Sequence, residues 1–318
     1  MAAFNANFNA DAKGVYIIAA TPFDDAGELD LDSTDRLVEF YLGHGADGLT
    51  ILGVMGEASR LSDEESLRFM RRVLQRVAGR VPVVVGTSHV SNRHVVRLSQ
   101  QAMDDGASGI MIAPTPGLKT DESIYRYFET LLAQIGPSVP VCYQDFPQAT
   151  GVETSVAVLD RLFRDFEQFV MFKHEACPGL RKLSQMRAQE AGGDAPARRR
   201  VSILVGNNGM YIPQEMQRGA DGMMTGFSYP ELLTGIWRLL GAGRAEAAED
   251  LYDCYLPLVK HEFQPGASLA LRKELLRRRG AIRCAAVRQP GPVLDARDHL
   301  DLDHLVGRLE RRLAALTL

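Results

Sequence analysis

Short apolar runs alternate along the chain with longer segments in which apolar residues recur at helical spacing. Eight of these runs are rich in Val, Ile, Leu or Met, and a segment long enough for a helix follows each. The predicted strands are VYIIAA from residue 15, GLTILG from 48, VPVVVG from 81, GIMIAP from 109, VPVCYQ from 139, FVMFK from 169, VSILVG from 201 and DGMMTG from 221. Strands that alternate with helices in this way predict a parallel sheet.

The number of units predicts how the sheet closes. Eight strand-helix units in about 240 residues match a (β/α)8 TIM barrel in count and size, whereas a doubly wound sheet more often has fewer strands. We therefore assign residues 14–242 to the barrel, residues 1–13 to a loose N-terminal arm and residues 243–318 to a C-terminal helical extension. The extension contains three helical segments, at about 243–262, 267–279 and 302–315.

One helix carries clear start and stop signals. Ser62 and Glu65 have the spacing of a capping box, and Gly79 is expected to end the helix. Its predicted apolar stripe consists of Leu67, Met70, Leu74 and Val77.

Composition and charge narrow the class of protein. The net charge of −4 arises from 40 acidic and 36 basic residues spread along 318 positions, so we expect neither nucleic acid nor a membrane surface as a partner. The four cysteines are widely spaced, which fits reduced thiols, and the N-terminus has no apolar leader, so a cytoplasmic protein is expected. Neither H-x-x-x-H nor H-E-x-x-H occurs, and no metal site is expected.

In a barrel of this type the reacting groups lie just past the strands, and there Lys173 is conspicuous. The chain has six lysines, and the other five lie in polar or helical surroundings, where a solvated surface position is expected. Strict alternation along FVMFK places Phe169, Met171 and Lys173 on one face of the strand, which would direct the amine into the barrel mouth.

Two interpretations of Lys173 are open at this point. The first is a structural ion pair with Glu175 or Asp145 at the mouth of the barrel. The second is an imine-forming nucleophile, which requires a neutral amine, although a free lysine has a pKa of about 10.4. An apolar strand that ends in lysine provides the desolvation that such a nucleophile needs.

The order of several motifs resembles the dihydrodipicolinate synthase / N-acetylneuraminate lyase family over nearly the whole chain. These motifs are TPF from residue 21, GVMGE from 53, the strand that ends before Pro147, FKHE from 172, GNN from 206 and GADGMMTG from 219. The resemblance implies a (β/α)8 barrel with C-terminal helices and a Schiff base between a 2-oxo acid and a strand-six lysine, the place that Lys173 occupies. The lysine itself then serves as the only cofactor, and a dimer or tetramer is expected.

Further site residues follow from their places just past the strands and from the same resemblance. Lys173, Gln144 and Glu175 are the predicted catalytic residues. The predicted substrate-binding residues are Met55, Gly56, Glu57, His89, Asp145, Asn207, Met224 and Thr225. Glu57 is expected to orient the carboxylate-binding loop, and His89 to contact substrate.

The chain departs from the family pattern at three places. Val54 and Met55 replace hydroxyl residues that usually hold the substrate carboxylate, which leaves only backbone N–H groups there. Gln144 stands where a proton-shuttling tyrosine is usual, and Tyr143, one residue earlier, should face the surrounding helices unless a bulge intervenes. Ala149 stands where the synthases carry a carboxylate-binding arginine, so a dihydrodipicolinate synthase is not expected.

Within the family, the chain is most similar to the L-2-keto-3-deoxyarabonate dehydratase branch. The shared strings are TSH from 87, QD-x-P from 144, FK-x-E from 172 and LPL-x-x-HE from 256. The resemblance implies a lyase of carbohydrate metabolism that dehydrates a 2-keto-3-deoxy sugar acid. Two alternatives are open: a class I aldolase that releases pyruvate through the same imine, and a non-catalytic barrel that binds sugar acids.

Overall fold

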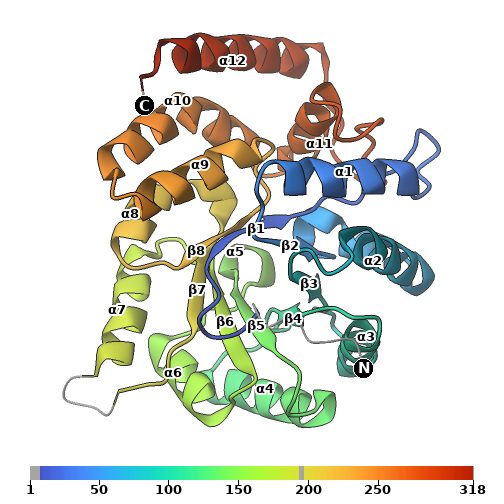
Figure 1. Cartoon of the computed structure of the whole chain (residues 1–318). Helices are drawn as coiled ribbons and strands as arrows, with labels where there is room; N and C mark the ends of the chain where they lie inside the picture. The colour runs from blue at the N-terminus through green and yellow to red at the C-terminus, as the bar shows by residue number, and fades with distance from the viewer. Residues whose placement is uncertain (1–7, 193–196, 318) are drawn as a thin grey trace.

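The strands form a closed parallel barrel in chain order (Figure 1). The computed structural model describes residues 8–192 and 197–317. The strands are β1 (Gly14–Ile18), β2 (Gly48–Ile51), β3 (Val83–Gly86), β4 (Gly109–Ile112), β5 (Val141–Asp145), β6 (Phe169–His174), β7 (Ser202–Val205) and β8 (Gly222–Thr225). Each predicted apolar run overlaps one of these strands, so the (β/α)8 prediction is confirmed.

Helices surround the barrel, and short 3₁₀ turns follow two strands at its carboxyl end. The helices around the barrel are α1 (Leu31–Gly43), α2 (Asp63–Val77), α3 (Asn92–Asp104), α4 (Asp121–Ile135), α5 (Pro147–Thr150), α6 (Val156–Asp165), α7 (Leu180–Ala191), α8 (Ile212–Gln217) and α9 (Pro230–Gly241). The 3₁₀ turns are η1 (Val54–Gly56), η2 (Ala58–Arg60) and η3 (Asn207–Gly209).

Helix α2 begins at the predicted N-cap. Ser62 and Glu65 form the predicted capping box. The buried stripe is centred on Phe69 and Val73, whereas Leu67 and Leu74 are only partly buried. Met70 and Val77 of the predicted stripe are buried as well, so the apolar sector includes half of that stripe and is wider than a single row of side chains.

The C-terminal extension consists of α10 (Ala245–Glu262), α11 (Ser268–Arg278) and α12 (Ala296–Ala315). Figure 1 shows α12, in dark red, lying across the top of the molecule next to α10. Helix α12 begins six residues before its predicted start at 302, because Asp295 caps it and forms a capping box with Asp298.

The side chains that fill the inside of the barrel, called the inner layer below, are almost entirely apolar. This layer consists of Tyr16, Ile18, Val84, Met111, Cys142, Met171, Leu204 and Met224, joined by Phe8 and Ala12. Phe8 is only 5% exposed and Ala12 only 6%, so these two residues pack against the barrel, and the prediction of a loose arm is wrong for them. Their apolar side chains close one end of the barrel; residues 1–7 of the predicted arm lie outside the described residues.

A register shift in β6 decides which way its side chains point. Val141 pairs with Phe169, but Cys142 pairs with Met171, so Val170 is an extra residue in β6. Phe169 therefore packs with the aromatic side chains under the helices, and the prediction that it shares a face with Lys173 is wrong. From Met171 onward the alternation is regular, and Lys173 follows Met171 on the inner face.

Candidate active site

Lys173 projects from the end of β6 into the barrel mouth, where Glu175 and Gln144 meet it. Its side chain is 5% exposed, and its Nζ lies 3.0 Å from Oε2 of Glu175. The Nε2 of Gln144 donates a hydrogen bond of 2.8 Å to the same carboxylate oxygen. Gln144 pairs with Lys173 across the β5–β6 register, so neighbouring strands bring all three predicted catalytic residues into contact.

The end of β7 makes room for the Glu175 carboxylate. A Cβ atom on Gly206 would lie 2.5 Å from Glu175 Oε1, so only glycine lets the two strands approach this closely. Asn207 follows in a left-handed conformation (φ 50°), and its Nδ2 donates to the backbone oxygen of Glu175 at 3.1 Å. Asn207 thus contacts the main chain of Glu175 and fixes the residue that holds Lys173.

Tyr143 lies on the opposite side of β5 from Gln144. Its side chain is fully buried among Phe128, Phe163 and Phe172, and its hydroxyl lies 2.8 Å from Oγ1 of Thr154. The sequence-based orientation of this residue is therefore confirmed. No tyrosine hydroxyl from this strand reaches Lys173.

The turn at residues 53–57, between β2 and η2, carries three predicted substrate-binding residues. Met55 packs against the inner layer of the barrel, and Gly56 is buried, with its carbonyl oxygen accepting a 2.6 Å hydrogen bond from Thr21 Oγ1. The hydrogen bonds of the turn itself begin at the N–H of Gly56, so the N–H groups of Val54 and Met55 precede them. Glu57 points away from Lys173 and forms a buried ion pair with Lys273 of α11.

A cavity of about 480 Å3 extends from Gln144 between the ends of β2 to β5. Gly86, Met111 and Ala113 form part of its wall. His89 and His94 line it as a stacked pair with ring centroids 4.2 Å apart. Of the described residues that line this cavity, none is Asp, Glu, Lys or Arg, and Ala149 is among them.

The other predicted substrate-binding residues are placed differently. Asp145 is buried and forms an ion pair of 2.5 Å with Lys182 of α7, so its carboxylate is directed away from Lys173. Burial raises the pKa of Asp145 to about 6 although Lys182 opposes this rise. Met224 belongs to the inner layer of the barrel, and alternation turns Thr225 towards the helices.

Two buried groups at this end of the barrel escaped the sequence analysis. Lys273 is completely buried, which contradicts the expectation of a solvated surface lysine; the apolar residues around it in α11 were the available signal. Glu215 of α8 is 2% exposed, and burial followed by the charge of Glu175 raises its pKa to about 8. No pattern in the sequence around Glu215 distinguishes it from a surface glutamate.

Three further properties concern the described residues as a whole. Within residues 8–192 and 197–317, no helix combines the length and the apolar character that crossing a membrane requires. In the same ranges, no group of three or more His, Cys, Asp or Glu side chains is arranged to hold a metal ion. The four cysteines are unpaired.

Comparisons with known proteins agree with this architecture. The family model "Dihydrodipicolinate synthetase family" matches residues 11–307. An L-2-keto-3-deoxyarabonate dehydratase from Azospirillum brasilense is 32% identical over 302 residues, which cover 94% of each chain. A 4-hydroxy-tetrahydrodipicolinate synthase from Porphyromonas gingivalis is 30% identical over 88% of this chain and 92% of its own.

A solved structure extends the similarity to three dimensions. The crystal structure of a dihydrodipicolinate synthase from Rhodopseudomonas palustris superposes with a TM-score of 0.91 and is 39% identical. It covers 94% of this chain, and the match spans 98% of the solved chain. These relatives carry the names of two different activities, so the residues of the site have to distinguish between them.

Proposed function

The chain belongs to the dihydrodipicolinate synthetase family and is a lyase, and from this premise we propose that it dehydrates a 2-keto-3-deoxy sugar acid through an imine on Lys173. The observation that carries the proposal is the shared contact of Lys173 Nζ and Gln144 Nε2 with one oxygen of Glu175. It supplies a nucleophile, a proton acceptor and a fixed hydrogen-bond donor within one buried cluster.

The first step is formation of the imine. Glu175 lies 3.0 Å from Nζ and can accept a proton from the ammonium group, after which the free amine attacks C2 of the 2-oxo acid. Loss of the C2 oxygen as water gives the protonated imine, which acidifies the C3 proton. Gln144 holds the Glu175 carboxylate in place during this step, but its amide group does not act as an acid or a base.

Dehydration follows from the enamine. Removal of the C3 proton places an electron pair between C2 and C3, and this pair expels the hydroxyl at C4 as water. Glu175 is the proposed base for the C3 proton and the acid for the departing hydroxyl, because Asp145 is already paired with Lys182. Tautomerisation and hydrolysis of the imine release the product, which for deoxyarabonate is 2,5-dioxopentanoate.

The lining of the cavity next to Gln144 suits the hydroxyl groups of a sugar acid better than a second carboxylate group on the substrate. Its side walls carry neutral donors and acceptors, including Ser59, Ser88 and Thr115, which suit the hydroxyl groups of a sugar chain. Ala149 offers no guanidinium group to a second carboxylate at this place. This composition favours the dehydratase over the synthase among the two activities named for the relatives.

Product analysis tests the proposal. Incubation with 2-keto-3-deoxy sugar acids of five and six carbons is expected to give a dioxo acid that has lost one water, detected by NMR and mass spectrometry. Pyruvate with an aldehyde would instead identify an aldolase that uses the same imine. If neither product forms and no 2-oxo acid binds, the proposal is wrong.

A further inference from the structure

We propose that the C-terminal extension positions the substrate-binding 53–57 turn by holding the carboxylate of Glu57. This inference rests on the proposed function, because it concerns the turn that carries Met55 and Gly56. The groups that hold Glu57 come from α11 and from residues 284–288, more than 200 positions away in the chain.

Glu57 is held from both sides although it is nearly inaccessible. Its side chain is fully buried, and it forms an ion pair with Lys273 of α11. Its Oε2 accepts a hydrogen bond of 3.0 Å from the backbone N–H of Arg288 and lies 3.2 Å from Nη1 of Arg60. Two of the three groups on this carboxylate thus belong to the C-terminal extension.

Lys273 connects three parts of the molecule. Besides its pair with Glu57, its Nζ donates a hydrogen bond of 2.8 Å to the backbone oxygen of Ala286. The same Nζ lies 4.3 Å from the ring centroid of Phe23, in the loop after β1. Burial lowers the pKa of Lys273 although the charge of Glu57 opposes this effect. The amine thus loses its hydration in this position, and the contacts with Glu57 and Ala286 replace it.

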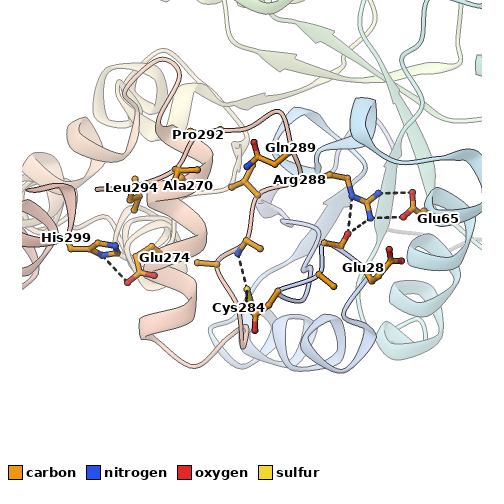
Figure 2. Close-up of a pocket in the computed structure, with 17 residues that line it drawn as sticks. Glu28, Glu65, Ala270, Glu274, Cys284, Arg288, Gln289, Pro292, Leu294 and His299 are labelled. Atoms are coloured by element: carbon orange, nitrogen blue, oxygen red, sulfur yellow. Dashed lines mark hydrogen bonds and ion pairs between the residues drawn. The ribbon is translucent and has the colours of Figure 1, made fainter. Parts of the chain in front are cut away.

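Arg288 connects the C-terminal extension to the segments on both sides of β2. Its guanidinium donates to the backbone oxygens of Gly27 and Arg60 and pairs with Glu65 of α2 at 2.7 Å. It also lies over the ring of Phe23, 4.4 Å from the centroid. Figure 2 shows Arg288 reaching Glu65 from the wall of a cavity of about 880 Å3 that is lined by residues 284–289 and 292–294, among others.

The 53–57 turn needs this support because of its backbone. Leu52 and Glu57, on either side of η1, are both in the left-handed region, with φ of 54° and 53°. Residues other than glycine keep such conformations only where the surroundings fix them. Thr21 also supports the turn through its hydrogen bond to the Gly56 carbonyl, but it does not touch Glu57. Loss of the Glu57 contacts is therefore expected to displace the N–H groups of Val54 and Met55, which in the proposed function bind the substrate carboxylate.

The test separates positioning from stability. Lys273→Met alone leaves the buried Glu57 carboxylate with Arg60 as its remaining ion-pair partner and can unfold the chain, so the neutral pair Glu57→Gln/Lys273→Met and the single variant Arg288→Ala are measured beside it. Arg277→Met is the matched control, since this residue lies on the same helix, is 46% exposed and pairs with Glu274. Thermal melts identify the variants that fold.

The readout is borohydride trapping of pyruvate as a function of pyruvate concentration. We expect the folded variants to need about tenfold more pyruvate for half-maximal trapping, with the trapped fraction at saturation unchanged, because the turn is misplaced while Lys173 is intact. The control should match the wild type. Unchanged midpoints in the folded variants would overturn this inference alone, whereas a wild-type chain that traps no 2-oxo acid overturns the proposed function and the inference with it.

Discussion

Lys173 forms the ion pair of the first sequence-based interpretation, and the same contact supports its proposed role as a nucleophile. Its Nζ lies 3.0 Å from Glu175, so the resting amine is paired, and the partner is the group that can take its proton. A variant that removes the amine leaves Glu175 buried with Gln144 as its side-chain partner. Some loss of stability is therefore expected from Lys173→Ala, in addition to the loss of turnover.

Gln144 and Tyr143 separate the dehydratase from an aldolase with a displaced tyrosine. Tyr143→Phe removes a hydroxyl that is hydrogen-bonded to Thr154, just before α6, so it should cost less than about 1.5 kcal/mol of stability and little activity. Gln144→Ala frees the Glu175 carboxylate and should lower kcat by about tenfold or more. Steady-state kinetics with denaturant unfolding tests both; a crippled Tyr143→Phe that releases pyruvate would favour the aldolase.

At the scale of elements, the bulge in β6 explains where sequence reasoning succeeded and where it failed. Alternation counted back from Lys173 is correct to Met171 and fails at Phe169, because Val170 is inserted and nothing in FVMFK marks it. The strands themselves were predictable, since each is a short apolar run between polar segments. The ion pair of Lys273 was not predictable from the sequence. Its partner is Glu57, and only the folded chain brings the two residues together.

The close approach of β7 to the residue after β6 gives a prediction at the same scale. Gly206→Ala introduces a Cβ atom 2.5 Å from Glu175 Oε1, so the carboxylate must move away from Lys173 and Gln144. We expect kcat to fall by about tenfold or more. Gly43→Ala, where a Cβ meets nothing within 4 Å, is the control and should keep full activity in the same assay. Equal activities of the two variants would show that the position of Glu175 does not matter.

At the scale of the whole molecule, Glu215 makes stability depend on pH. Its folded pKa of about 8 lies above the ordinary value of 4.5, so the native state holds an extra proton between these values. Stability contributed by this proton is present below pH 4.5 and is lost as pH rises to about 8, by up to about 1.4 kcal/mol per pH unit. Glu215→Gln should therefore gain stability relative to the wild type from pH 5 to pH 8.

Denaturant unfolding at each pH measures this effect. Glu246→Gln, at an exposed position of α10, is the control, and its difference from the wild type should stay constant with pH. A constant difference for Glu215→Gln as well would show that Glu215 titrates normally in the folded chain.

The dimer or tetramer expected from the family resemblance stays a prediction.

Borohydride reduction followed by peptide mass spectrometry tests the central claim most directly. With a panel of 2-oxo acids, the account predicts a reduced adduct on the peptide that contains Lys173, with the largest yield for 2-keto-3-deoxy sugar acids. The adduct should disappear in Lys173→Met and persist in Lys260→Met, which removes an exposed lysine. An adduct on another lysine, or no adduct with any 2-oxo acid, would contradict the account.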